Sequence, residues 1–152
     1  MKKVVICLIV VIVIALVAVG VIFGRQRLLV NKYSNIEKYE LRNDSIPSVA
    51  KVVGSGTLKK VTTKKDRTND IETLELVYED SNAKASSEKY IEYLKENDNY
   101  LDTKAENDNI RRIAETSSNS DDLITVETEL TENGYIVRIE VEKGFLGLEE
   151  QD

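Results

Sequence analysis

The side chains available for chemistry in this chain are carboxylates, lysines, tyrosines and serines. The sequence contains no histidine, and its single cysteine, Cys7, lies inside a long apolar run near the N-terminus. The usual zinc ligand sets, Cys-His nucleophilic sites and Ser-His-Asp triads therefore cannot be assembled outside that run. We predict a protein that is not an enzyme and assign no catalytic, cofactor-binding or metal-binding residue.

Two patterns resemble catalytic or metal-binding motifs. Residues 86–89 read Ser-Ser-Glu-Lys and match the Ser-x-x-Lys pattern of penicillin-recognising enzymes, but the chain has no Ser-Asp-Asn or Lys-Thr-Gly partner. We interpret this pattern as an exposed helix turn. The neighbouring acids Glu127 and Glu129, and also Asp121 and Asp122, are candidates for acid-base work or calcium binding. Because 27 acidic residues bring such neighbours together freely and no calcium-loop motif is present, a solvated face is the favoured interpretation.

Tyrosines are the third candidate group, because several of them together can line a ligand groove. Half-buried tyrosines whose hydroxyls stay in contact with water are the commoner use, and we favour it here. The residues concerned are Tyr78, Tyr90, Tyr93, Tyr100 and Tyr135.

All of these candidates come after an apolar run of 20 residues, 4–23, that contains no charged side chain. A helix of that length is about 30 Å long, which matches the hydrocarbon thickness of a bilayer. The run is rich in valine and isoleucine, but a single span must be helical because lipid offers the backbone no hydrogen-bond partner. We therefore predict a transmembrane anchor over residues 1–24.

Two properties of the anchor have alternatives. A cleaved signal peptide is the competing interpretation, since residues 18–20 form a small-x-small site, but the run is longer than a usual signal-peptide core. Lys2 and Lys3 before the run are nearly matched by basic residues after it, so the flanking charges barely choose an orientation. We expect a single-pass protein of the cell membrane with an extracytoplasmic domain, because N-terminal signal anchors usually export the domain attached to their C-terminal end.

The rest of the chain divides into a juxtamembrane stalk (25–45), an α+β domain (46–146) and an acidic tail (147–152). Residues 25–152 carry 19 basic and all 27 acidic side chains, a formal charge of −8. This charge argues against nucleic acid and against anionic lipid headgroups as partners. With no cysteine in the domain, packing alone must stabilise it.

Hydrophobic periodicity predicts the elements of the domain. Residues 56–65 and 71–79 suit a hairpin around a polar turn at 66–70, with Leu74, Leu76 and Tyr78 on one face. Residues 82–97 suit an amphipathic helix capped by Asp80, Ser81 or Asn82. Residues 46–54 suit one or two helical turns, with Pro47 first and Gly54 as a left-handed cap, or else a strand. Residues 100–104 suit a strand, 110–116 a strand more than a helix, and 117–122 a loop.

A second hairpin is predicted around Asn133-Gly134, a dipeptide typical of two-residue turns. That turn makes Leu130 face Val137, Thr128 face Ile139, and Val126 face Val141, all on one buried face. On the other face it makes Glu129 meet Arg138 and sets Glu127 opposite Glu140. The predicted fold is one antiparallel sheet covered on one face by the helix 82–97.

The order of these features resembles small anchored or lipidated envelope proteins of Gram-positive bacteria that have no assigned function. The features are the N-terminal anchor, the segment 46–54, a strand ending Val77-Tyr78, the helix with Tyr90-x-x-Tyr93-Leu94, and the strand 134–139. The resemblance covers roughly the last two-thirds of the chain. It implies an extracytoplasmic α/β domain and brings no catalytic residue with it.

The function that these observations favour is a membrane-anchored, extracytoplasmic binding or interaction module that is not an enzyme. Its expected partners are the membrane, through residues 4–23, and another envelope protein, with no role for nucleic acid. One alternative is a small hydrolase that uses carboxylates on envelope glycan. The other is an anchored cytoplasmic adaptor, which the near-tie of flanking charges permits.

Overall fold

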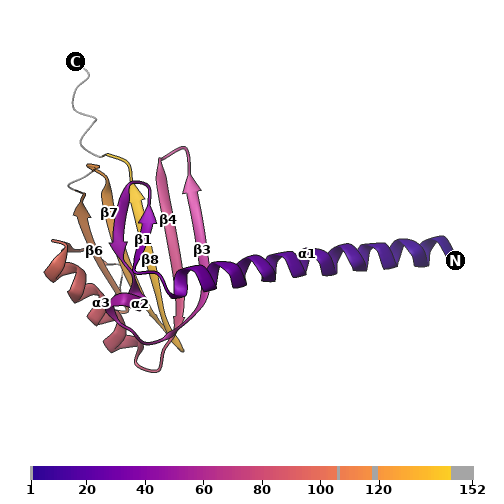
Figure 1. Cartoon of the computed structure of the whole chain (residues 1–152), viewed down its shortest axis with the longest axis horizontal. Helices are drawn as coiled ribbons and strands as arrows, with labels where there is room; N and C mark the ends of the chain where they lie inside the picture. Colours follow the sequence, from indigo (N-terminus) through magenta and orange to yellow (C-terminus); the bar gives the residue numbers. More distant parts are fainter. Residues whose placement is uncertain (1, 106, 118–119, 145–152) are drawn as a thin grey trace, which may run out of the picture.

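The computed structural model describes residues 2–105, 107–117 and 120–144, which form a long N-terminal helix followed by an α+β domain (Figure 1). The elements are α1 (Lys2–Ser34), β1 (Lys38–Leu41), β2 (Asp44–Pro47), α2 (Val49–Val52), β3 (Thr57–Asp66), β4 (Ile71–Glu79), α3 (Ala83–Asn97), β5 (Leu101–Thr103), β6 (Ile110–Thr116), β7 (Leu123–Thr131) and β8 (Gly134–Glu142). The predicted acidic tail at 147–152 lies outside the described residues.

The backbone of α1 is helical from Lys2 to Ser34 and therefore includes the whole apolar run 4–23. Within the described part of the chain, no helix contains a stretch that is both long and apolar enough to cross a bilayer. Most side chains of the run itself lie outside that described part.

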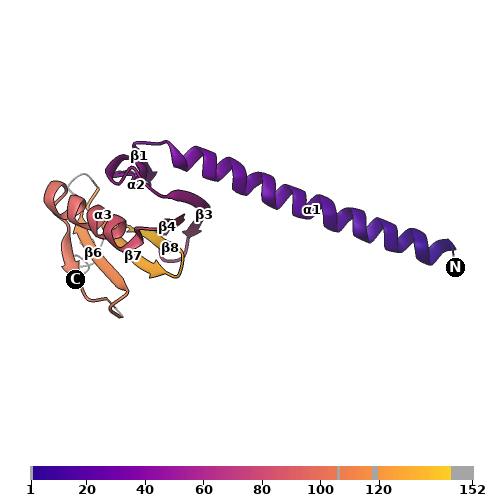
Figure 2. The same ribbon diagram turned by 90° about the horizontal axis from the view of Figure 1, so that it is seen from below.

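Six strands form one antiparallel sheet in the order β3-β4-β8-β7-β6-β5. Helix α3 packs on one face of this sheet against β6, β7 and β8, and the hairpin β1–β2 and helix α2 lie on the same side (Figures 1 and 2). No described element lies over the opposite face (Figure 2). The predicted α+β architecture, an antiparallel sheet with its main helix on one face, is confirmed.

The hydrophobic core fills the space between the sheet and this layer. Alternate residues of the strands point into it, and α3 contributes one apolar stripe, because a strand repeats every two residues and a helix every 3.6. Its most deeply buried members from these elements are Val61, Leu74, Leu76, Tyr90, Ile91, Leu94, Ile113, Val126, Tyr135, Val137, Ile139 and Val141.

The hairpin β3–β4 has the predicted arms and turn, and its register runs from Thr57 opposite Glu79 to Asp66 opposite Ile71. The Asp66 carboxylate accepts hydrogen bonds from the backbone N–H groups of Thr68 (2.8 Å) and Asn69 (3.3 Å). Such local bonds from an aspartate stabilise a turn, which explains why this polar stretch reverses the chain. The predicted strands at 100–104 and 110–116 are confirmed as β5 and β6.

The register predicted for the last hairpin is wrong by two residues. The turn consists of Glu132 and Asn133, so that Val126 faces Ile139 and Glu127 faces Arg138. The predicted turn needs positive φ at its central residues, which neither Asn133 nor Gly134 adopts. The predicted buried face survives, because a shift of two residues keeps every side chain on its side of the sheet.

The position of Gly134 explains why the Asn133-Gly134 dipeptide predicts the wrong turn. It is the first residue of β8, where a Cβ atom would lie 1.9 Å from the carbonyl oxygen of Tyr78. Glycine is required there because two backbones approach closely, not because a turn needs a left-handed residue. The predicted pairs of Glu129 with Arg138 and of Glu127 with Glu140 are absent from the described register.

The segment 25–45, predicted as a stalk, is part of the domain. It contains the end of α1, strand β1 and the beginning of β2, and Tyr39 and Leu41 of β1 are buried in the core. Two buried residues in a stretch of mixed polarity give too weak a pattern to recognise from sequence. The folded domain thus begins before residue 46.

The helical turn predicted within 46–54 is present as α2, but it begins later than expected. Pro47 ends β2, and the N-cap is Ser48, whose hydroxyl oxygen accepts a hydrogen bond from the backbone N–H of Lys51 (3.1 Å). Gly54 has a φ of +72°, the left-handed conformation predicted for it.

Helix α1 is fixed to the sheet along its edge strand β3. The side-chain amide of Gln26 donates to the carbonyl oxygen of Val61 (3.0 Å), and its oxygen accepts from the N–H of Val61 (3.4 Å). Leu29, Val30 and Tyr33 of α1 then pack against the core. The amide of Gln26 therefore occupies backbone groups that an edge strand otherwise leaves open, and the helix and domain form one body.

Candidate functional site

The Ser-x-x-Lys pattern does not form a catalytic pair. Ser86 is buried, and its hydroxyl donates to the Asp80 carboxylate (2.6 Å), whereas the Lys89 ammonium donates to the carbonyl oxygen of Val53 (3.3 Å). Asp80 also accepts from the N–H of Asn82 (2.7 Å), so it supports the start of α3 from outside the helix. Of the three predicted capping residues, Asn82 occupies the cap position without a side-chain bond, and Asp80 provides the hydrogen bonds.

Of the predicted acid pair Glu127 and Glu129, Glu127 is engaged in ion pairs. The Glu127 side chain is only 7% exposed and bridges Arg112 and Arg138, with 2.5 Å to the Arg138 guanidinium. Arg138 also pairs with Glu75 at 3.1 Å. These four residues lie opposite one another in register on β4, β8, β7 and β6 and form a row of alternating charge. Glu127 is therefore a structural carboxylate that is ion-paired with two arginines, and it is not free to act as an acid or base.

In the second predicted pair, Asp121 and Asp122, only Asp122 has a structural role. The Asp122 side chain is 4% exposed, accepts from the guanidinium of Arg42 (3.1 Å) and accepts from the N–H of Gly144 (3.1 Å). Asp121 is exposed. Within the described residues, no group of three or more possible ligands is arranged to hold a metal ion.

The tyrosines are more deeply buried than predicted, apart from Tyr93, which is 37% exposed. Tyr78 and Tyr135 stack in the core with ring centroids 5.3 Å apart. The Tyr90 hydroxyl donates to the carbonyl oxygen of Pro47 (2.8 Å), and the Tyr39 hydroxyl accepts from the N–H of Val49 (3.0 Å). The Tyr90 hydroxyl thus connects α3 to the β1–β2 hairpin, and the Tyr39 hydroxyl connects that hairpin to α2, so these two hydroxyls do not face water.

The best candidate for a functional site is an acidic cleft at the end of the sheet remote from β3. It has a volume of about 570 Å³ and lies between the β1–β2 hairpin, the end of α3, and strands β5, β6 and β7. Three carboxylates line it: Asp44 from the hairpin, Asp98 after α3, and Glu115 from β6. Lys38 lines it as well. Ligands usually bind in clefts where a few polar groups converge.

Two of these carboxylates have raised pKa values. Burial raises the pKa of Glu115 to about 7, although a hydrogen bond from the Tyr100 hydroxyl opposes the shift. The negative charges of Asp98 and Asp44 raise it further. Burial also raises the pKa of Asp98, and the positive charge of Lys38 opposes this second shift. Near neutral pH, Glu115 therefore either donates or accepts a hydrogen bond.

The third carboxylate is buried and hydrogen-bonded. Asp44 is 3% exposed and accepts hydrogen bonds from the hydroxyls of Ser117 and Ser120, the latter at 2.9 Å. Asp98 differs, because its Oδ2 atom is buried and has no hydrogen-bond partner among the described atoms. A buried acceptor without a partner is uncommon in folded proteins, and a donor brought by a ligand would satisfy it.

Sequence reasoning missed this cleft entirely. Its carboxylates come from positions 44, 98 and 115, which no motif connects, and the first of them was assigned to the stalk. Only the topology brings these three segments together. The chain matches no protein-family model and no curated protein.

Proposed function

We propose that this protein is a membrane-anchored, extracytoplasmic interaction module that is not an enzyme, and that its acidic cleft contacts the partner. The anchor is inferred from the apolar run 4–23, and the exported topology from the usual behaviour of N-terminal signal anchors. The resemblance to anchored envelope proteins of Gram-positive bacteria agrees with this proposal.

The observation that carries the proposal is the attachment of α1 to the domain. Gln26 and the apolar residues after it fix the helix to β3 and the core. The direction of α1 therefore determines the orientation of the sheet relative to the membrane. Successive strands are about 4.8 Å apart, so the cleft beside β6 and β5 lies about 20 Å from the β3 edge. With α1 as anchor, the cleft faces away from the bilayer.

The polar groups that line the cleft are also suited to contact with a partner. The unpartnered Oδ2 of Asp98 is an acceptor, Glu115 accepts when it is ionised, and Lys38 is the one cation among the described lining residues. A partner that presents N–H or cationic groups complements this set. The candidate partner is therefore another envelope protein with a basic segment.

A capture experiment tests this function. The full chain, in detergent and bearing an affinity tag, is incubated with an envelope extract, alongside an Asp98→Asn/Glu115→Gln variant and a Glu88→Gln control on the exposed surface of α3. We expect a protein retained by the wild type and the control but lost from the cleft variant. Equal retention by all three, or none by any of them, would refute the proposed contact site.

The second candidate function is hydrolysis of envelope glycan, and one observation favours it. Glu115 has a pKa of about 7 and lies beside Asp98 and Asp44, an arrangement that suits a general acid next to a second carboxylate. The assay is release of reducing ends from purified cell-wall glycan. Turnover by the wild type that is lost in Glu115→Gln would establish this function. Wild-type turnover no greater than that of the variant would rule it out.

A further inference from the structure

The basic residues of the domain are unevenly distributed, although residues 25–152 together have a formal charge of −8. Strand β3 alone contributes Lys59, Lys60, Lys64 and Lys65, and all four are exposed. Lys59 pairs with Glu79, and Lys65 pairs with Glu72 at 2.5 Å. Lys60 and Lys64 make no ion pair with any described residue, so the edge strand has a net positive charge.

The end of the apolar run adds to this charge. Arg25 and Arg27 come shortly after Phe23, are exposed, and form no ion pair within the described part of the chain. Leu28 is 71% exposed on the same stretch of helix. Cations beside exposed apolar side chains are the composition typical of a membrane interface.

The contact between α1 and β3 determines the depth of this basic edge. Gln26, which binds the backbone of Val61, lies three residues after Phe23, the last residue of the apolar run. The contact with β3 is therefore about 4.5 Å beyond the end of that run along the helix axis. The headgroup layer on each side of a bilayer is about 5–7 Å thick. Strand β3 runs crosswise to α1, on the side of the sheet toward the N-terminus (Figures 1 and 2). The whole strand therefore lies near headgroup level if the run 4–23 spans the membrane.

We propose that the β3 edge and residues 25–28 form a basic surface that rests on anionic lipid headgroups. This inference rests on the proposed membrane anchor and adds a second contact with the bilayer. It revises the expectation that the negative net charge argues against contact with anionic lipid headgroups, because the net charge does not show that the basic edge and the acidic cleft lie in different places. The lipid contact holds the cleft away from the membrane and limits tilting of the domain.

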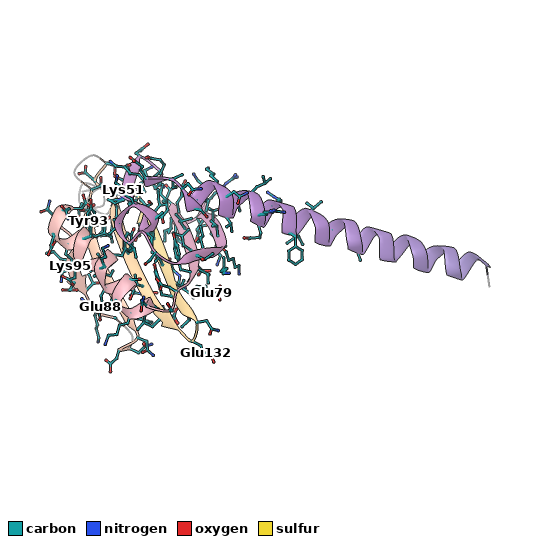
Figure 3. The ribbon with its side chains drawn as sticks, turned by 60° about the horizontal axis from the view of Figure 1, so that its bottom comes forward. Lys51, Glu79, Glu88, Tyr93, Lys95 and Glu132 are labelled. Carbon is teal, nitrogen blue, oxygen red and sulfur yellow. The ribbon has the colours of Figure 1, made fainter. Side chains whose placement is uncertain are left out.

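The test measures the distance between β3 and the headgroups in the full chain. In a Cys7→Ser background, a fluorophore is attached through Thr63→Cys on the exposed β3 edge or through Glu88→Cys on α3, on the side of the domain away from the N-terminus (Figure 3). The protein is reconstituted in phosphatidylcholine vesicles with or without phosphatidylglycerol, together with lipid that carries a nitroxide quencher in its headgroup.

We expect strong quenching at position 63, stronger with phosphatidylglycerol, and weak quenching at position 88. Each lysine near an anionic surface changes the population in contact about fivefold, so Lys60→Glu/Lys64→Glu should remove most of the quenching. The matched control, Lys84→Glu/Lys89→Glu on α3, changes the net charge equally and should leave it intact. Added salt should weaken quenching at position 63 in the unmodified edge.

Equal quenching at positions 63 and 88, or no dependence on phosphatidylglycerol, would overturn the inference. Extraction of the chain from the vesicles by alkaline carbonate would instead show that the anchor itself is wrong. Retention after carbonate without selective quenching at position 63 leaves the anchor standing and rejects only the lipid contact.

Discussion

Arg42 connects three separate segments of the domain, and its removal should be one of the most damaging single changes. Its Nε donates to the buried Asp122 carboxylate (3.1 Å), and its Nη1 donates to the carbonyl oxygen of Asp70 (2.9 Å). Its own backbone N–H donates to Glu72 (3.0 Å) and does not depend on the side chain. Replacing Arg42 with alanine leaves the Asp122 carboxylate, 4% exposed, with no ion-pair partner among the described residues.

Breaking a buried ion pair from one side costs about 3–5 kcal/mol, because the remaining charge stays desolvated. A domain of this size has an unfolding free energy of about 5–15 kcal/mol, so Arg42→Ala should remove a large part of it. Arg42 also has a φ of +52°, and glycine relieves about 1 kcal/mol of that strain. Arg42→Gly should therefore be less damaging than Arg42→Ala by about that amount.

The assay is urea unfolding of the full chain in detergent, followed by tyrosine fluorescence. The control is Arg67→Ala, an exposed arginine in the β3–β4 turn that makes no ion pair with a described residue, and it should change stability by less than about 0.5 kcal/mol. Adding Asp122→Asn to Arg42→Ala should recover part of the loss. The reasoning is refuted if Arg42→Ala costs no more than Arg67→Ala, or if the double variant shows no coupling.

The remaining predictions use the same unfolding assay. Ile139→Ala should cost about 2–5 kcal/mol because Ile139 is fully buried, and Arg138→Ala should cost less, about 1–3 kcal/mol, because Glu127 keeps its bond to Arg112. A larger loss for Arg138→Ala would mean that the buried face is assigned wrongly. Gly134→Ala should cost about 3 kcal/mol or more, since its Cβ would lie 1.9 Å from a carbonyl oxygen, and a mild effect would refute the close approach. The folded protein retains the Glu115 proton up to about pH 7, whereas the unfolded chain releases it near pH 4.3, so the unfolding free energy should fall as pH rises through this window. In Glu115→Gln this fall should be smaller, by about 1–2 kcal/mol after allowing for solvent screening in the open cleft, and an unchanged pH profile would count against the raised pKa.

The parts of the fold that sequence predicts are those with a regular and local pattern. The alternation in 71–79 and the three-and-four spacing in 82–97 identify β4 and α3, because each period places one apolar face on the core. Local signals were less reliable where a tertiary contact competes with them. Gly134 comes after Asn133 as a hairpin turn would require, yet it is needed for the approach to Tyr78.

The candidate site depends wholly on long-range arrangement. Asp44, Asp98 and Glu115 converge because the β1–β2 hairpin folds back over the end of the sheet, and Tyr39 within a mixed segment gives no periodic signal for that hairpin. The same limit explains the basic edge, since net charge carries no information about which side of a domain its lysines occupy. Composition therefore excluded histidine- and cysteine-dependent chemistry but could not locate either surface.

Export of an anchored domain is tested most directly by two fusions at the C-terminus of the full chain, one to alkaline phosphatase and one to a fluorescent protein that matures only in the cytoplasm. The same fusions to a chain that begins at residue 25 serve as the control without the apolar run. We predict an active phosphatase and no fluorescence for the full chain, with the phosphatase fusion retained in the membrane fraction after alkaline carbonate. Fluorescence together with an inactive phosphatase would contradict the exported topology and would favour the anchored cytoplasmic adaptor.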